Sequence, residues 1–169
     1  MKINSTKING HVRGRVRVVS VDGDLIFGLN STTDAAQDVI RGLLMRDFRN
    51  KALAYVALGK GGDCEITPPH NDTGIRVAPD PAETEMRILV EKIQIQTSRE
   101  DGDDVVLVAV ARPEQAQDPD INEFGLLTED ETLFAHFVTE EVAPGGRATK
   151  YPKTDVYWII EWPVEYVST

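Results

Sequence analysis

Apolar and polar residues alternate along the last strand that the sequence predicts. From position 156 to position 162 the even positions are all apolar, while the odd positions are mostly polar-tipped. This period of two is typical of a strand with one face in a core. The even row consists of Val156, Trp158, Ile160 and Trp162. We expect this strand to anchor the domain, because truncating a buried tryptophan costs about 3–5 kcal/mol. We expect Pro163 to end its ladder, because proline donates no hydrogen bond.

Two hairpins are predicted upstream of that strand. The runs 121–127 and 133–138 flank the short acidic connection Thr128–Glu131, which is a hairpin signal. Near the N-terminus, Asp22-Gly23 separates the runs 18–21 and 25–27 and fits a two-residue turn in which glycine supplies a positive φ.

Between these hairpins the period changes to that of a helix. The segment Ser31-Thr32-Thr33-Asp34 offers helix-capping side chains. Apolar residues then recur at steps of three and four, which predicts an amphipathic helix lying on a sheet. These residues are Ala36, Val39, Ile40, Leu43, Leu44 and Phe48, with Arg41, Arg46, Asp47 and Arg49 on the other face. A short apolar strand over 52–58 follows.

Two longer strands are predicted in the middle of the chain. The run 85–97 changes the phase of its alternation, so we expect a bulge or bend near Glu91-Lys92. The run 105–111 is apolar at every position, which indicates a central strand buried on both faces until Pro113 stops it.

The predicted elements give a mainly β fold with one α-helix. We expect a β-sandwich-like domain of mixed, mostly antiparallel sheets over residues 1–169, because 169 residues suit one domain. Residues 1–10 are interpreted as a possible N-terminal arm. Residues 59–82 are interpreted as an extended surface loop, because the run from Asp63 to Pro81 holds four prolines. Rigid sheets would then display the loops 60–82 and 139–153.

Charge and cysteine content narrow the possible environments. The single cysteine, Cys64, has no partner within the chain, which indicates synthesis in a reducing compartment. No apolar run is long enough to span a bilayer, so no membrane partner is expected. The 28 acidic residues against 18 basic ones give a formal charge of −10, which disfavours nucleic acid as a partner.

The basic residues near the N-terminus form a local exception. Arg13, Arg15 and Arg17 alternate with apolar or small residues, so a strand here has one arginine face. This face is our candidate interface. It is interpreted either as an arm that docks on an acidic neighbour, such as another copy of the chain, or as the solvated outer face of an edge strand, which is the more common situation.

No segment carries a catalytic or cofactor signature. Gly59-Lys60-Gly61-Gly62-Asp63 lacks the Ser or Thr of a phosphate loop, so we interpret it as a flexible loop. His70 and Asp72 are two potential metal ligands, but no second pair of ligands follows at the spacing that a metal site needs. The calcium-loop spacing of Asp118, Asp120, Asn122 and Glu129 has Glu123 where that loop needs glycine. We therefore predict no catalytic residue, no metal site and no cofactor, and no enzyme.

Several segments together resemble a group of small virion proteins of tailed bacteriophages. The pieces Tyr55–Gly61, Ile121–Leu126, Leu133–His136 and the closing strand are similar to the family patterns YIALGxG, INExGLF, LFAR and WxIxF. Here His136 replaces the arginine of LFAR, and 140–147 lengthens a loop. The pattern covers roughly residues 31–162.

The resemblance implies a structural part of the virion in the neck or collar, the tail or the fibre attachment. Synthesis would occur in the host cytoplasm, and the partners would be further copies in a ring or symmetric assembly and other virion proteins. Two alternatives stay open, a capsid decoration protein and a β-sandwich module that binds carbohydrate or metal. Tyr55, His70 and Tyr151 would be the candidates for the binding module.

Overall fold

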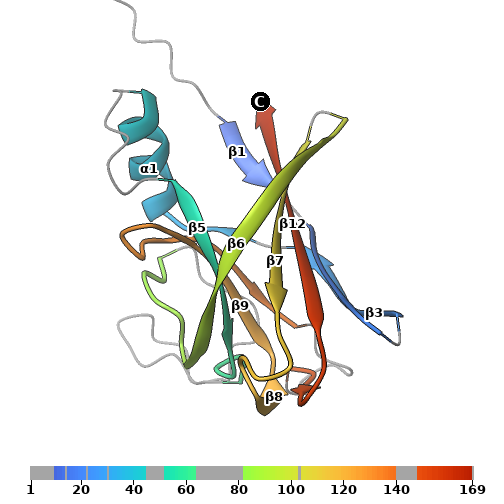
Figure 1. The fold of residues 1–169 in the computed structure, drawn as a ribbon. Coiled ribbons are helices and arrows are strands. Elements are labelled where there is room, and N and C mark those ends of the chain that lie inside the picture. Colours follow the sequence, from blue (N-terminus) through green and yellow to red (C-terminus); the bar gives the residue numbers. More distant parts are fainter. Residues whose placement is uncertain are drawn as a thin grey trace, which may run out of the picture.

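Antiparallel strands make up most of the part of the chain that the structure describes, as the sequence predicts (Figure 1). The computed structural model describes residues 10–13, 15–21, 23–29, 31–44, 52–63, 82–102, 104–139 and 148–168. The elements are β1 (Gly10–Arg13), β2 (Arg15–Ser20), β3 (Gly23–Leu29), β4 (Ser31–Thr32), α1 (Ala35–Leu44), β5 (Leu53–Gly59), β6 (Leu89–Asp101), β7 (Asp104–Ala111), β8 (Asp118–Ile121), β9 (Glu123–Thr128), β10 (Leu133–Val138), β11 (Tyr151–Lys153) and β12 (Trp158–Ser168).

Ten strands form one curled sheet in the order β3-β2-β12-β7-β6-β5-β9-β10-β4, with β1 pairing on β12. Strands β8 and β11 form a separate small sheet. The strand pairs of the described part of the chain are all antiparallel. The predicted fold class, mainly β with one helix and sandwich-like, is therefore confirmed.

The long strand β6 belongs to both layers of the sandwich. Its first half pairs with β5, and its second half pairs with β7. The ladder is irregular at Val90 on the β5 side and at Gln96 on the β7 side. A bulge bends and twists a strand, and the second one lies where β6 changes partner. The predicted bend near Glu91-Lys92 therefore lies one residue earlier, and the strand begins at Leu89, not at Glu85.

The predicted tryptophan strand is confirmed. Trp158, Ile160 and Trp162 of β12 are fully buried. From the opposite layer, Phe124 of β9 stacks on Trp158 with ring centroids 6.5 Å apart. This contact joins the two layers across the core, to which α1 contributes Ala36 and Val39 near β10.

Pro163 does not end the ladder of β12, so that prediction is wrong. Pro163 pairs with Val106, and the strand continues to Ser168. On its other side β12 pairs with β2 at residues 159–161 and with β1 at residues 165–168. Proline lies between these two pairings, where a missing N–H interrupts no ladder.

Two turns differ from their predictions in detail. Ser20 pairs with Gly23, so Gly23 is the first residue of β3 and not part of the two-residue turn that we expected, although it has the expected positive φ, of 108°. Ser31 and Thr32 do not cap the helix, because they form β4 beside β10. The Thr33 hydroxyl donates to the carbonyls of Leu133 and Phe134 instead.

Two further expectations need correction. Val105 at the start of β7 is 45 % exposed, and Val108 and Val110 are only partly buried, so this central strand is fully buried on one face and not on both. Part of the predicted loop 139–153 is the strand β11, which pairs with β8. Residues 64–81 and 140–147, most of the two predicted loops, lie outside the described residues, as does the arm up to residue 9.

Candidate functional site

Two ionisable side chains meet on the outer face of the β9–β10 hairpin. In this hairpin Glu123 pairs with Val138 and His136 pairs with Gly125, so Glu123 and His136 are diagonal neighbours on one face. Nε2 of His136 lies 2.9 Å from Oε1 of Glu123. Both residues are fully buried. A buried ion pair needs further polar partners to offset its desolvation.

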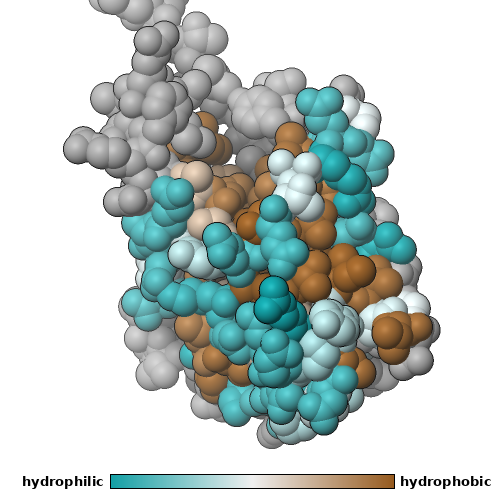
Figure 2. Space-filling view, in the orientation of Figure 1, coloured by the Kyte–Doolittle hydropathy of each residue, from teal (hydrophilic) through white to brown (hydrophobic). Residues whose placement is uncertain are grey.

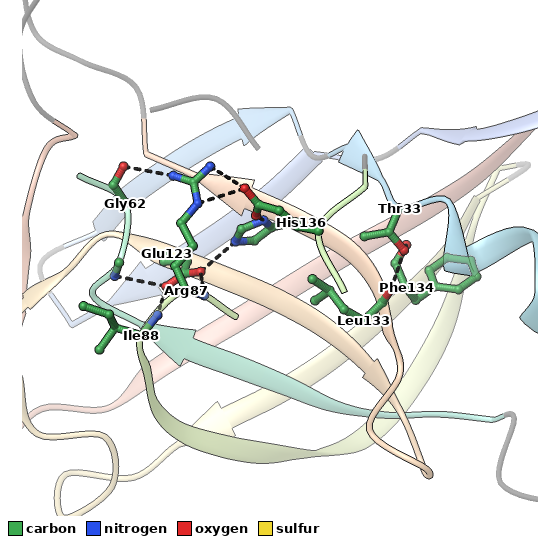
Figure 3. Close-up of polar contacts among 10 residues, drawn as sticks. Thr33, Gly62, Arg87, Ile88, Glu123, Leu133, Phe134 and His136 are labelled. Carbon is green, nitrogen blue, oxygen red and sulfur yellow. Dashed lines mark hydrogen bonds and ion pairs between the residues drawn. The ribbon is translucent and has the colours of Figure 1, made fainter. Parts of the chain in front are cut away.

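The segment 82–88 supplies these partners (Figure 3). Oε2 of Glu83 lies 2.6 Å from Nδ1 of His136. The two atoms form an ion pair, although their contact does not have the geometry of a hydrogen bond. Oε1 of Glu83 accepts hydrogen bonds from Nε and Nη2 of Arg87, at 3.0 and 2.8 Å. Arg87 also donates from Nη1 to the carbonyl of Gly62, at 3.1 Å. Charges therefore alternate in sign along Glu123, His136, Glu83 and Arg87, which we call the ionic junction.

Backbone N–H groups complete the shell of Glu123. Its carboxylate accepts from Gly61 at 3.0 Å, from Arg87 and from Ile88 at 3.1 Å. This close approach requires glycine at position 61, because a Cβ there would lie 2.6 Å from the nitrogen of Ile88 and 2.7 Å from Oε2 of Glu123. Three strands and the segment 82–88 are thereby fixed around one carboxylate.

The ionic junction favours the charged form of each titratable member. Burial by itself lowers the pKa of His136, but its contacts with Glu123 and Glu83 raise that pKa above the ordinary value. Burial raises the pKa of Glu83, yet His136 and Arg87 outweigh it and lower the pKa to about 2. The pKa of Glu123 is also lowered, because His136 and the backbone donors outweigh burial. The ionic junction therefore stabilises the packing of segment 82–88 on the sheet.

A second set of contacts holds the ends of the two predicted loops together. Oδ1 of Asn122 accepts from the N–H of Gly62 at 2.9 Å, and the carbonyl of Asn122 accepts from the N–H of Thr139 at 3.1 Å. The carboxylate of Asp63 accepts from the N–H of Ala148 at 2.7 Å. Asp63 is therefore bonded directly to the residue after 140–147, and Gly62 is linked through Asn122 to the residue before it.

The outer faces of the two layers differ. On the β5–β9–β10 layer, segment 82–88 covers the sheet, and Met86 packs against the small cluster of Ala57, Leu127 and Leu133. On the β2–β12–β7 layer, Tyr157 is 52 % exposed and Ile159 is 42 % exposed. Figure 2 shows apolar side chains at the surface over β7 and β12. We call this second surface, built on Val19, Val108, Val110, Tyr157 and Ile159, the β12–β7 face.

Two arginines share one glutamate on the β12–β7 face. Nη1 of Arg17 lies 3.1 Å from Oε2 of Glu161, and Nη2 of Arg99 lies 3.0 Å from Oε1. The arginine side chains are 42 % and 47 % exposed, so these pairs contribute little to folding. The pairs place three charged groups beside the apolar centre of the face.

The three predicted interface arginines lie on β1 and β2. Arg13 pairs with Glu165 in the ladder, Arg15 pairs with Leu29, and Arg17 pairs with Glu161. The structure places the side chain of Arg17 on the β12–β7 face. The side chains of Arg13 and Arg15 lie outside the described residues.

The segment 59–63 is not the flexible loop that we predicted. Gly61 and Gly62 are buried, and their N–H groups are bonded to Glu123 and Asn122. Lys60 pairs with Asp118 at 2.9 Å. The backbone donors that would bind a phosphate are therefore already occupied.

The other candidate ligand residues lie in different settings. Asp118 and Asp120 belong to strand β8 and contact Lys60 and Lys150. No group of three or more His, Cys, Asp or Glu residues in the described ranges could hold a metal ion. Tyr55 packs against the small outer cluster while Tyr151 packs on the main core, so the structure does not bring them together. His70 and Cys64 lie outside the described residues.

The ionic junction is the part that sequence reasoning missed. A signal was present, because Glu123 and His136 interrupt two otherwise apolar runs whose hairpin pairing was predicted. That pairing already put them on one face. Nothing local in the sequence indicates that Glu83 and Arg87 join them, because these residues follow a long connection.

Comparison with known proteins adds no family to this description. The protein-family models, the curated proteins and the solved structures gave no match. In the described part of the chain no helix has the length and apolar character needed to cross a membrane.

Proposed function

We propose that this chain is a structural subunit that acts by oligomeric assembly, in the virion of a tailed bacteriophage. The observation that carries the assembly part of this proposal is the β12–β7 face. One outer face of the sandwich is covered by segment 82–88, whereas the β12–β7 face exposes Tyr157 and Ile159 beside two arginines. Exposed apolar residues that are contiguous and have a polar rim are typical of protein–protein contact sites.

The rigidity of the loop ends also supports a scaffold role. Asn122 and Asp63 hold the ends of two sequence-distant loops in one place. Binding residues are often found on loops that a rigid sheet positions. In a ring or other symmetric assembly, each such contact is repeated, so weak individual contacts add up.

The sequence resemblance supplies the virion part of the proposal. It favours a place in the neck or collar, the tail or the fibre attachment, with other virion proteins as further partners after synthesis in the host cytoplasm. The same face would also serve a capsid decoration protein. Immunogold labelling of particles from a phage that encodes this chain would distinguish these positions, and labelling of neither tail nor head would contradict a virion role.

The assembly proposal predicts that reversing two charges on the arginine face disrupts the oligomer. In Arg13→Glu with Arg15→Glu, we expect loss of the oligomer because an acidic partner surface would be repelled. The mass in solution should fall to that of the monomer, measured by light scattering coupled to gel filtration, while the thermal melting curve stays cooperative. Persistence of the oligomer at physiological salt would show that these arginines do not dock.

A further inference from the structure

We propose that segment 82–88 is a switchable cover on the β5–β9–β10 layer, which opens from its N-terminal end when His136 becomes a neutral imidazole. Opening uncovers the small outer cluster against which Met86 packs in the closed state. The cover would thus control access to an apolar surface on this layer. The inference goes beyond the proposed function and is independent of assembly.

A protonated imidazole can serve both of its carboxylate neighbours, whereas a neutral one cannot. Nε2 of His136 lies 2.9 Å from Glu123, and Nδ1 lies 2.6 Å from Glu83 (Figure 3). The imidazolium carries a proton on each nitrogen, so each carboxylate lies beside a protonated nitrogen. Neutral imidazole has one N–H and one lone pair, so one of the two carboxylates then faces a lone pair. The ionic junction therefore holds both glutamates only while His136 is charged.

The contacts of the two glutamates decide which one leaves the imidazole. Glu123 is fully buried in β9, and its carboxylate also accepts from three backbone N–H groups. Glu83 lies outside the sheet, and its side chain is 13 % exposed. Its ion pair with Arg87 can persist when the segment moves, because both residues belong to segment 82–88. The single N–H of neutral imidazole therefore stays with Glu123, and Glu83 is released from His136.

Backbone contacts hold the C-terminal end of the segment in place. The N–H groups of Arg87 and Ile88 donate to Glu123, and the carbonyl of Ile88 accepts from the N–H of Lys60 at 3.0 Å. These bonds do not depend on the protonation of the imidazole. Arg87 and Ile88 therefore stay on the sheet, and residues 82–86 are the part that opens.

The elements packed around His136 identify the charges that act on it. β4 consists of Ser31 and Thr32, which carry no charge. The charged or titratable groups of the described neighbours are Glu123 of β9, Glu83 and Arg87 of the segment, Tyr55 of β5, and the exposed pair Asp38 and Arg41 of α1. Contacts with the two glutamates raise the pKa of His136 above 6.5, so the cover should open as pH rises through that raised pKa.

Thiol labelling at position 86 tests this opening. Met86→Cys in a Cys64→Ser background places a single thiol where the segment packs on the sheet. Dividing its labelling rate by that of the denatured protein at the same pH removes the ionisation of the thiol itself. We expect the normalised rate to rise about tenfold or more between about pH 6 and about pH 9, because one unit of difference in the pKa of His136 between closed and open states is a factor of ten.

A second thiol position distinguishes local opening from unfolding of the whole domain. Ala109 is fully buried in β7, on the other layer. In Ala109→Cys, in the same Cys64→Ser background, the thiol should stay protected over the same pH range. Equal rises in labelling at positions 86 and 109 would show global unfolding and would overturn the local opening.

Two glutamine variants test the role of the imidazole. In Glu83→Gln the side-chain oxygen can still accept from Arg87, while the amide N–H can donate to the lone pair of neutral imidazole but meets an N–H of the charged form. The pH dependence of labelling should therefore reverse, with faster labelling at the acidic end. Glu85→Gln removes an exposed carboxylate of the same segment, and it should keep the pH dependence of the wild type.

Two results would overturn the proposal. One is a thiol at position 86 that is equally protected at both ends of the pH range, and the other is an unaltered rise of labelling with pH in Glu83→Gln. If Met86→Cys does not fold, hydrogen exchange of the unmodified protein replaces labelling. After correction for intrinsic exchange, residues 82–86 should then lose protection at alkaline pH while Arg87 and Ile88 keep it, and equal protection throughout would again overturn the opening.

Discussion

At the scale of single residues, the ionic junction shows how a charged pair is kept inside an apolar hairpin. His136 lies between Glu123 and Glu83, and Arg87 balances the second carboxylate. The backbone donors of Gly61 and Ile88 satisfy Glu123 further. Each charge therefore has a partner of opposite sign, and removing one member would leave a buried charge uncompensated, which costs about 3–5 kcal/mol.

Stability should depend on the protonation of His136. Its folded-state pKa is raised above 6.5, so protonation stabilises the fold fully below that pH and the contribution is lost as pH rises through the folded-state pKa. Each unit of difference in pKa corresponds to about 1.4 kcal/mol. We expect the free energy of unfolding, from urea titrations between about pH 6 and about pH 9, to fall in that window.

The variant His136→Arg is the control for this pH dependence. Its charge does not titrate, so the decline above pH 6.5 should flatten even if the longer side chain lowers stability throughout. The carboxylates contribute to the pH dependence of stability on the acidic side. The pKa of Glu83 is lowered from 4.5 to about 2, so its contribution to stability is lost as pH falls towards about 2. An equal alkaline decline in wild type and variant would show that another group titrates.

At the scale of elements, segment 82–88 is fitted to the sheet by glycines. Gly125 lies under Met86, and a Cβ there would approach the sulfur to 2.4 Å. A Cβ at Gly61 would approach the Cβ of Arg87 to 2.4 Å and the backbone nitrogen of Ile88 to 2.6 Å. Gly59 of β5 also meets the segment, since a Cβ there would lie 2.6 Å from the carbonyl oxygen of Ile88. The segment therefore packs closely because these contact positions have no side chain.

Gly125 and Gly61 should differ in their tolerance of alanine. Gly125→Ala meets the flexible Met86, which can move, so we expect a loss of about 1–3 kcal/mol that Met86→Ala partly restores in the double variant. Gly61→Ala meets backbone and the buried carboxylate of Glu123, so we expect a larger loss and no rescue by Met86→Ala. Urea denaturation of wild type, the three single variants and the two double variants tests this, and equal losses at both glycines would contradict the backbone contact.

The sequence predicted local elements well and long-range contacts poorly. The even row of β12, the β9–β10 hairpin and α1 follow from periodicity, which depends only on neighbouring residues. The continuation through Pro163 depends on which strands flank it on each side. The burial of Gly61 depends on Glu123, 62 residues later, and that of Gly62 depends on Asn122, 60 residues later. Such contacts are decided by tertiary packing, which local patterns do not encode.

At the scale of the whole molecule, the two outer faces of the sandwich differ in what covers them. Segment 82–88 lies on one of them, while the other presents Ile159 and Tyr157 beside the ion pairs of Arg17 and Arg99 with Glu161. A subunit with one self-covered face and one exposed apolar face has a direction. Subunits that contact one another through two different surfaces can associate in series. Where the rotation from one copy to the next closes on the first copy, the series is a ring.

Assembly through such a contact should weaken as salt is added. The screening length falls to about 10 Å at 0.1 M and about 3 Å at 1 M, so attraction between the arginine face of one copy and an acidic surface of the next declines. Sedimentation velocity from low to high salt should show a growing monomer fraction. The thermal stability of the monomer should change little or rise, because salt also screens repulsion among the many acidic groups. Stronger assembly at high salt would indicate a contact carried by apolar burial alone.

The passage of β6 through both layers has a mechanical consequence. A pull on β7 is passed to β5 through β6. The single backbone of β6 is hydrogen-bonded to β5 along its first half and to β7 along its second half. Sliding one layer over the other would require a whole row of these hydrogen bonds to break together, since no side-chain interface separates the layers along β6. The two layers should therefore resist shear as one unit, and they should separate only when β6 loses one of its two ladders.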